Sequence, residues 1–263
     1  MKNFTEDFYK LLSLLKNGEP FAFTRFSDGE LFILQNRKIS VEENQVYLRE
    51  GYHQGYWGKE EHKVFIPEDH SFFRDKLIEC FRYTSSNFYK GICCSEDVGR
   101  IDFESQFEFI DDSPEHNLTW ANLLINANYP RFIEEMVPEF KNKKIIYICN
   151  SEAKIENLPF SIFKDFRVGS NCHIDNYSLV EEIKKWGLQE SIKDSVFLFS
   201  CGTLSNFIIP TLHESMDDNT YIDIGSTLNP ILGLTGWVGS RHYLLEYWGN
   251  KPREYLNMVG VWG

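Results

Sequence analysis

Two carboxylates one residue apart, Asp28 and Glu30, stand where the apolar run of residues 21–26 gives way to the start of a helix. Such a pair can hold a hard divalent cation, because Mg²⁺ and Mn²⁺ take carboxylate oxygens and bridge them to substrate phosphates. The same segment also fits a capping box, in which Ser27 and Glu30 satisfy the first amides of a helix. The local sequence leaves both a metal–phosphate site and a helix cap open.

Three further residues could take part in chemistry near this pair. Asp223 lies near the end of the apolar run of residues 221–224, where an unpaired charge would be costly, so it needs a partner or a role as ligand or general base. His173 is a second candidate base, although a lone loop histidine is more often structural. Arg25 adjoins the acidic pair and could compensate an anionic ligand.

Short apolar runs without alternation recur along the chain, as is typical of strands covered on both faces. They comprise residues 21–26, 91–94, 145–149, 166–168, 196–199 and 221–224. Helical patterns separate most of them and are clearest over 119–128, 130–140 and 175–186, the last with Asp175 as cap and Gly187 as stop. This rhythm predicts one α/β domain over residues 1–263, with a doubly wound, mostly parallel, Rossmann-like sheet flanked by helices.

Two segments depart from that rhythm. Residues 39–66 are rich in glycine and aromatic residues, which predicts irregular structure, within an irregular and helical insertion around residues 39–118. Residues 236–263 form an aromatic C-terminal tail, which is the best candidate for contacts between copies of the chain.

The residues that follow each predicted strand are small and polar, as expected for a phosphate or nucleotide crevice at the carboxyl ends of a doubly wound sheet. In residues 201–206, a glycine followed by hydroxyls at a helix start could cradle a diphosphate, and a plain capped turn explains the same residues equally well. No full Walker or G-x-G-x-x-G pattern is present. The candidate binding residues are Asn150, Asn171, Gly202, Thr203, Ser205, Asn206, Gly225 and Ser226.

Bulk composition narrows the partners. The formal net charge of −12, from 27 basic and 39 acidic residues, opposes binding to nucleic acid and to anionic lipid. The six cysteines show no C-x-x-C spacing and lie mostly in apolar runs, as expected for reduced thiols in a cytoplasmic protein. No signal pattern and no run of about 18 apolar residues is present. Peripheral contact with the inner face of the membrane and homo-oligomer formation stay open.

Three segments, taken in order, resemble the GT-D-type bacterial glycosyltransferases. They are residues 23–30 (Phe-Thr-Arg-Phe-Ser-Asp-Gly-Glu), residues 200–206 and residues 221–226. That family carries an Arg-aromatic-Gly-Asp-Gly-Glu segment after its first strand, then a Gly-Pro-Thr-like turn, and an Ile-Asp-hydrophobic-Gly strand near the end. In this chain Ser27 replaces the usual glycine, and the turn at 201–203 lacks the proline.

The resemblance implies a transferase that moves a sugar from a nucleotide-diphosphate sugar to a glycan or glycoconjugate, in bacterial surface polysaccharide or glycoprotein assembly. It implies that Asp28 and Glu30 work with Mn²⁺ or Mg²⁺ and the diphosphate. We expect Arg25 and the amides around Gly202 to assist, with Asp223 or the histidine named above as the base. The alternatives are a metal-dependent phosphoesterase or nucleotide-sugar hydrolase, and a noncatalytic carbohydrate-binding protein.

Overall fold

A seven-stranded sheet forms the centre of the computed structural model, which describes residues 4–42, 45–48, 52–53, 63–110, 116–234 and 241–249. Its order is β7-β6-β1-β11-β10-β8-β9, and every strand pair is parallel. The strands are β1 (Ala22–Phe26), β6 (Phe88–Ile92), β7 (Asn117–Trp120), β8 (Lys144–Asn150), β9 (Lys164–Val168), β10 (Ser195–Ser200) and β11 (Thr220–Asp223). The predicted doubly wound α/β fold is confirmed.

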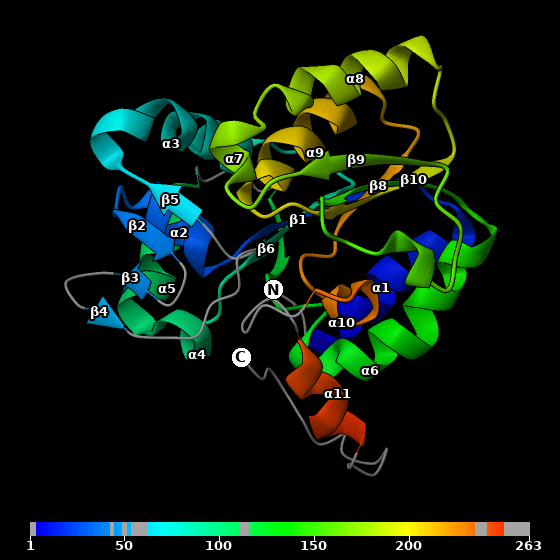
Figure 1. The fold of residues 1–263 in the computed structure, drawn as a ribbon, viewed down its shortest axis with the longest axis horizontal. Helices are drawn as coiled ribbons and strands as arrows, with labels where there is room; N and C mark the ends of the chain where they lie inside the picture. The colour runs from blue at the N-terminus through cyan, green and yellow to red at the C-terminus, as the bar shows by residue number, and fades with distance from the viewer. Residues whose placement is uncertain are drawn as a thin grey trace.

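Helices cover both faces of this sheet (Figure 1). One face packs against α2 (Asp28–Leu34), α3 (Pro67–Arg82), α8 (Leu179–Gln189) and α9 (Thr203–Ser215). The other packs against α1 (Phe4–Asn17), α10 (Asn229–Leu232) and a helical stretch made of α6 (Tyr129–Arg131), a π-helix (Phe132–Met136) and a 3-10 helix (Val137–Asn142). Side chains of adjacent strand residues pack into the hydrophobic cores on opposite faces of the sheet, as those of Phe197 and Leu198 do. Both faces are therefore buried, which explains why the strands are mainly apolar.

A second sheet, which is antiparallel and has the order β4-β3-β2-β5, lies to one side of the main sheet (Figure 1). Its strands are β2 (Ile39–Glu42), β3 (Gln45–Leu48), β4 (Tyr52–His53) and β5 (Lys63–Phe65). Where residues 39–66 are described, the prediction of irregular structure is wrong, because most of these residues pair with one another as short strands.

The insertion predicted around residues 39–118 is also less separate than expected. It contains helices α3, α4 (Ser95–Val98) and α5 (Arg100–Ser105), and a 3-10 turn (Gln106–Glu108). However, β6 and the start of β7 fall within the same range and belong to the main sheet. The chain therefore leaves the central sheet after β1 and returns to it before the predicted boundary.

Two predicted helices differ from those observed. Residues 117–120 form edge strand β7, and only Asn126–Asn128 of the predicted helix 119–128 form a 3-10 turn, because pairing with β6 places Thr119 opposite Gly91. The predicted helix 175–186 is divided into α7 (Cys172–Asp175) and α8, so Asp175 ends a helix instead of capping one. Gly187 lies inside α8, where a Cβ would fall 2.7 Å from Met216 Cε. This glycine permits close packing and does not stop the helix.

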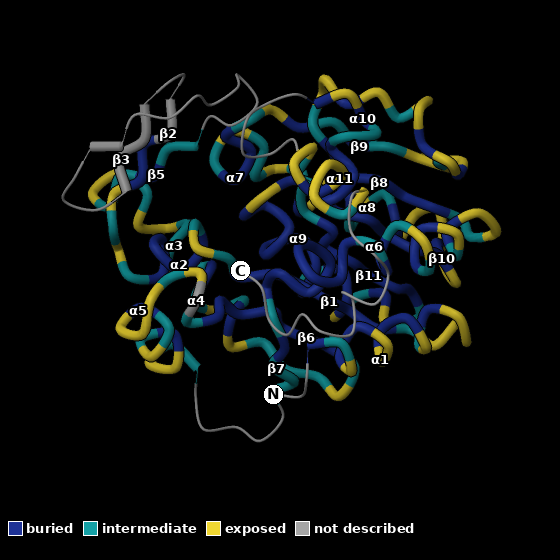
Figure 2. Tube along the Cα trace, turned by 90° about the horizontal axis from the view of Figure 1, so that it is seen from below, coloured by how far each residue is buried: buried dark blue, intermediate teal, exposed yellow. Residues whose placement is uncertain are grey.

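The two halves of the chain meet where β1 pairs with β11. Beyond that pair, β6 and β7 lie on the side of β1, and β10, β8 and β9 lie on the side of β11. Figure 2 shows β1, β6, β11 and α9 as a buried centre, with exposed segments at the periphery. In an open sheet of this kind, the carboxyl ends of the strands where two halves meet form a natural binding crevice.

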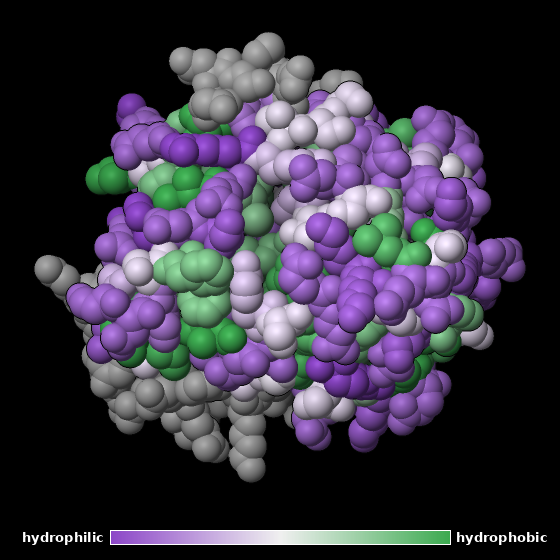
Figure 3. Space-filling model, turned by 90° about the horizontal axis from the view of Figure 1, so that it is seen from above, coloured by the Kyte–Doolittle hydropathy of each residue, from purple (hydrophilic) through white to green (hydrophobic). Residues whose placement is uncertain are grey.

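The surface of the molecule is mainly polar. The face in Figure 3 is largely hydrophilic, with hydrophobic areas between the polar side chains.

The remaining predictions from composition concern cysteines, membrane spans and the C-terminal tail. All six cysteines are free thiols. Within the described ranges, the structure has no helix that is both long and apolar enough to span a membrane. Of the predicted aromatic tail at 236–263, α11 (His242–Gly249) and the residue before it are described, and the remainder lies outside the described residues.

Candidate functional site

A cleft of about 320 Å³ opens at the carboxyl ends of the central strands. Five strands each contribute a residue from their last two positions: Arg25 from β1, Asn150 from β8, Val168 from β9, Ser200 from β10 and Asp223 from β11. The parallel sheet therefore brings together residues that are nearly 200 positions apart in the sequence, as the strand-end loops predicted.

Glu30 is buried in the wall of this cleft and is bound by three groups of the protein. The predicted capping box forms, with the Ser27 amide donating to Glu30 Oε2 at 3.1 Å. The Lys63 ammonium lies 2.9 Å from Oε1, and the Thr203 hydroxyl donates to the same oxygen. Burial opposes ionisation, but the Lys63 charge and these hydrogen bonds outweigh it and lower the pKa of Glu30 to about 2.

Asp28 is placed quite differently from Glu30. Its side chain is exposed at the start of α2, lines the cleft, and accepts a 3.3 Å hydrogen bond from the Ser27 hydroxyl. The two carboxylates, which are close in the sequence, therefore lie in different environments. Glu30 is held in the cleft wall, and Asp28 faces solvent.

The fit of a divalent ion to this pair follows from the same contacts. A carboxylate offers about four lone-pair sites, and three of those on Glu30 receive hydrogens from Ser27, Lys63 and Thr203. A dication bound to Glu30 would also lie beside the Lys63 ammonium, and the two positive charges would repel each other. Among the residues that the structure describes, no group of three or more His, Cys, Asp and Glu side chains converges as metal ligands do. Glu30 as placed fits an ammonium partner and does not fit a dication.

Asp223 is the second buried carboxylate of the cleft and is only 4% exposed. Its Oδ1 accepts from the Gly225 amide at 2.9 Å, and its Oδ2 accepts from the Ser205 hydroxyl at 3.1 Å. Burial raises the pKa of Asp223 to about 6, although the Arg25 charge and the Gly225 amide partly counter this. A carboxylate with this pKa is largely ionised at neutral pH and can accept a proton, as a general base must.

Arg25 supplies a buried positive charge next to Asp223. Its Nε donates to the carbonyl oxygen of Ala121, which fixes the guanidinium over the end of the sheet. A Cβ built on Gly225 would fall 1.8 Å from Arg25 Nη1, so only glycine leaves room for this side chain. The backbone at Gly225 also has a φ of +50°, a conformation that glycine adopts without strain.

The first turn of α9 lies between the two carboxylates. Its N-cap, Gly202, has a φ of +52°. From the next residues, Thr203 donates to Glu30 and Ser205 donates to Asp223. The helix thereby presents its positive end to the cleft while it holds both acids in place, and helix N-termini of this kind favour anions such as phosphate.

The predicted site residues divide into those that line the cleft and those that support it. The residues that line it are Arg25, Asp28, Glu30, Asn150, Gly202, Thr203, Asp223, Gly225 and Ser226. Three others stand behind the wall: Asn171 binds the Val64 amide at 3.0 Å, Ser205 holds Asp223, and Asn206 donates to Thr24 and to the Arg25 carbonyl oxygen.

His173, the alternative base, also lines the cleft but has a different environment. It is 2% exposed, and burial together with the Lys63 charge lowers its pKa to about 3. It is therefore neutral at physiological pH. Its Nε2 has no hydrogen-bond partner within the described residues. Asp223 fits the role of a proton acceptor better, because its pKa lies closer to neutrality.

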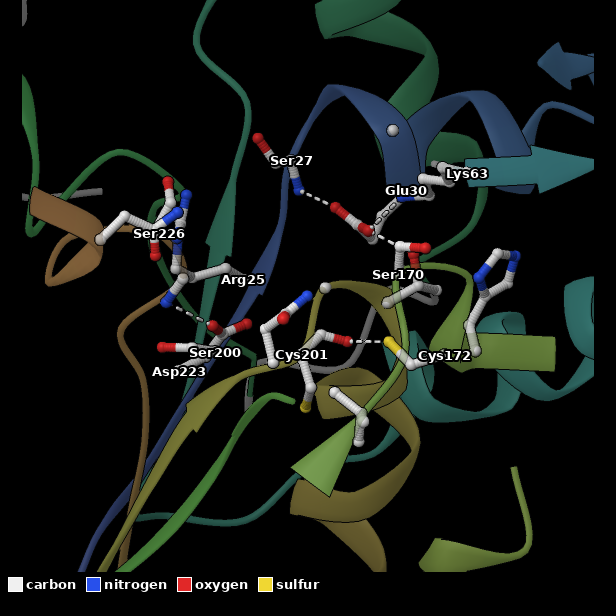
Figure 4. Close-up of a pocket in the computed structure, with 18 of the residues that line it drawn as sticks. Arg25, Ser27, Glu30, Lys63, Ser170, Cys172, Ser200, Cys201, Asp223 and Ser226 are labelled. Atoms are coloured by element: carbon white, nitrogen blue, oxygen red, sulfur yellow. Dashed lines mark hydrogen bonds and ion pairs between the residues drawn. The ribbon is translucent and has the colours of Figure 1, made fainter. Parts of the chain in front are cut away.

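Two cations of the cleft were not among the predicted site residues. Lys63 comes from β5, in the segment predicted to be irregular, and Arg241 precedes α11 and donates to Ser226 Oγ at 2.9 Å. Neither residue belongs to a local motif that would have marked it. Figure 4 shows Lys63 beside Glu30 on one side of the cleft and Arg25 near Asp223 on the other.

Comparisons with known proteins find solved structures with a similar fold. No protein-family model and no curated protein sequence matches the chain. A solved structure of domain of unknown function 1792 matches with a TM-score of 0.55 and 13% identity, over 97% of this chain and 88% of that one. A structure described as a new glycosyltransferase of the same domain type, from Streptococcus sanguinis, matches with a TM-score of 0.52 and 13% identity, over 92% and 84% of the two chains.

A third solved structure is described as showing that domain of unknown function 1792 has a distinct glycosyltransferase fold. It matches with a TM-score of 0.52 and 11% identity, over 92% of this chain and 80% of that one. The chain therefore has this glycosyltransferase fold, and the resemblance to GT-D-type glycosyltransferases is confirmed at the level of the fold.

Proposed function

We propose that this chain is a glycosyltransferase that moves a sugar from a nucleotide-diphosphate sugar to a glycan or glycoconjugate acceptor. The observation that carries the proposal is the arrangement of Asp223 and Arg25, a proton acceptor and a fixed cation buried side by side in the cleft of a glycosyltransferase fold. The resemblance in sequence adds bacterial surface polysaccharide or glycoprotein assembly as the proposed setting.

Glycosyl transfer makes two demands on such a cleft. The leaving diphosphate gains negative charge as the anomeric carbon takes on oxocarbenium character, so it needs fixed positive groups. Arg25, Arg241 and the N-terminus of α9 supply these groups along the cleft wall. The acceptor hydroxyl must also lose its proton, and we assign that proton to Asp223.

The Mn²⁺ or Mg²⁺ ion predicted from the Asp28–Glu30 spacing stays a prediction. Asp28 is the carboxylate of the pair that is available to such an ion, since Glu30 is engaged by Lys63 and Thr203. A cytoplasmic location, peripheral contact with the membrane and self-association likewise stay proposals, and the first is consistent with the free thiols of all six cysteines.

A screen of nucleotide sugars tests the proposal directly. UDP-, GDP-, ADP- and dTDP-sugars would be incubated with the protein, once with EDTA and once with Mn²⁺, and release of the nucleoside diphosphate would be followed. We expect turnover of one donor class, and we expect Asp223→Asn to lower that turnover while leaving nucleotide binding intact. Cleavage of simple phosphate esters without any donor turnover would instead identify a phosphoesterase. Binding of a free sugar alone, without turnover, would identify a carbohydrate-binding protein.

A further inference from the structure

Lys63 occupies the place beside Glu30 where the sequence predicts a divalent ion. Its Nζ lies 2.9 Å from Glu30 Oε1, and a Cβ built on Gly29 would fall 2.6 Å from the same nitrogen. The Lys63 side chain is 23% exposed and lines the cleft, and Figure 4 shows it next to Glu30. The ammonium therefore lies against both the acidic carboxylate and the start of α2.

The position of Lys63 is fixed by the fold. Lys63 opens β5 and pairs with Val41 of β2. The next residue, Val64, is held by a contact from outside the small sheet, because its amide donates to Asn171 Oδ1 at 3.0 Å. The small antiparallel sheet thus delivers a cation to the cleft at a defined point.

An ammonium at this point can do the electrostatic work that a dication does in related chemistry. Lys carries three N–H donors on a compact charge and is an established phosphate ligand, and the ion pair with Glu30 uses one of the three. A charge fixed by the protein before the reaction begins stabilises a developing oxyanion without reorganisation.

We propose that Lys63, and not a divalent ion at Glu30, is the cation that holds and neutralises the departing diphosphate. This inference rests on the proposed function. In the transfer, the bond between the anomeric carbon and the β-phosphate oxygen breaks, and its electron pair stays on that oxygen, beside Lys63. The acceptor oxygen forms the new bond to the anomeric carbon and gives its proton to Asp223. Glu30 acts as a positioning residue that holds the ammonium.

The test is calorimetric binding of UDP, GDP, ADP and dTDP, each in EDTA and in Mn²⁺, to the wild type and to Lys63→Met. We expect one nucleotide to bind in EDTA, with Mn²⁺ changing its affinity little. We expect Lys63→Met to weaken that binding by about 10- to 100-fold, the usual range for a lost charge-assisted hydrogen bond. Lys76→Met is the matched control, because Lys76 pairs with Glu79 on the surface of α3, outside the cleft lining.

A second variant guards against misfolding of Lys63→Met, which leaves Glu30 without its counter-charge. Gly29→Ala removes no charge and suits a helix, yet its new methyl carbon would fall 2.6 Å from Lys63 Nζ, so the ammonium must shift. We expect it to weaken nucleotide binding in EDTA by a smaller factor than Lys63→Met and to leave the melting temperature near that of the wild type.

The outcomes separate this inference from the proposed function. Binding only in Mn²⁺, or binding in EDTA that Lys63→Met and Gly29→Ala leave unchanged, would overturn the role of Lys63 while the transferase proposal stands. If no nucleotide binds under either condition, the proposed function itself fails, and the inference fails with it.

Discussion

Replacing Asp223 by asparagine should change how the stability of this protein depends on pH. Burial raises the pKa of this carboxyl from 3.8 to about 6. Between these values the folded protein keeps the proton and the unfolded chain releases it. The free energy of unfolding therefore falls as the pH rises from about 4 through 6. Asparagine has nearly the same shape as aspartate, and its side-chain oxygen can still accept the hydrogen bond from the Gly225 amide, but it does not ionise.

The size of the effect follows from the shift. About two pKa units at 1.36 kcal/mol each give about 3 kcal/mol, which is fully developed above about pH 7 and mostly absent near pH 4. Asp223→Asn should therefore gain about 3 kcal/mol relative to the wild type as the pH is raised from 4 to 8. Comparing the variant with the wild type at each pH cancels the titration of His173, which acts in the opposite direction over much of the same range.

Urea unfolding at pH 4, 5, 6, 7 and 8 measures this difference. Asp28→Asn serves as the control, because it removes a carboxylate from an exposed position of the same cleft. A difference between Asp223→Asn and the wild type that stays constant from pH 4 to pH 8 would show that Asp223 is not held in a desolvated state. The assignment of this carboxyl as a base with a pKa near neutrality would then lose its physical foundation.

Three other perturbations test the cleft. Glu30→Gln should lower the free energy of unfolding at pH 7 by about 3 kcal/mol, because the pKa of Glu30 is lowered from 4.5 to about 2. The stability that the ionised carboxylate adds is lost only as the pH falls below 4.5, so urea unfolding at pH 7 measures it in full. Gly225→Ala places a methyl group 1.8 Å from a guanidinium nitrogen, so it should abolish nucleotide binding in calorimetry, whereas Gly18→Ala, at a positive φ with open space around it, should cost stability alone. His173→Gln should flatten the loss of stability between pH 6.5 and pH 4, because burial lowers the pKa of the histidine to about 3, and an unchanged slope in urea unfolding would contradict this.

Much of the fold and part of the site were accessible from local sequence. Apolar runs without alternation predicted six of the seven parallel strands, all but β7, because a strand buried on both faces has no polar side. The capping box at Ser27 and Glu30 forms as predicted, since its partners are three residues apart. Asp223 was found because a carboxylate at the end of an apolar strand is costly without a partner.

Local sequence failed where a neighbour distant along the chain decides the structure. Residues 119 and 120 begin the predicted helix 119–128 but pair with β6 as part of strand β7. Gly187 was predicted to stop a helix, but it lies inside α8, and Met216, which follows α9, packs against it. Tertiary contacts of this kind override local propensity.

The sequence by itself determined which residues of this chain can carry chemistry: an acidic pair at a helix start, an arginine beside it, and an isolated strand-end carboxylate. Only the tertiary structure decided their states. Glu30 meets Lys63 and Thr203 across 33 and 173 positions, and these contacts pair the carboxylate with an ammonium and a hydroxyl that the local sequence did not indicate. The physical reason is that the charge state of a buried group depends on desolvation and on neighbouring charges, which are set when distant strand ends converge and not by sequence spacing.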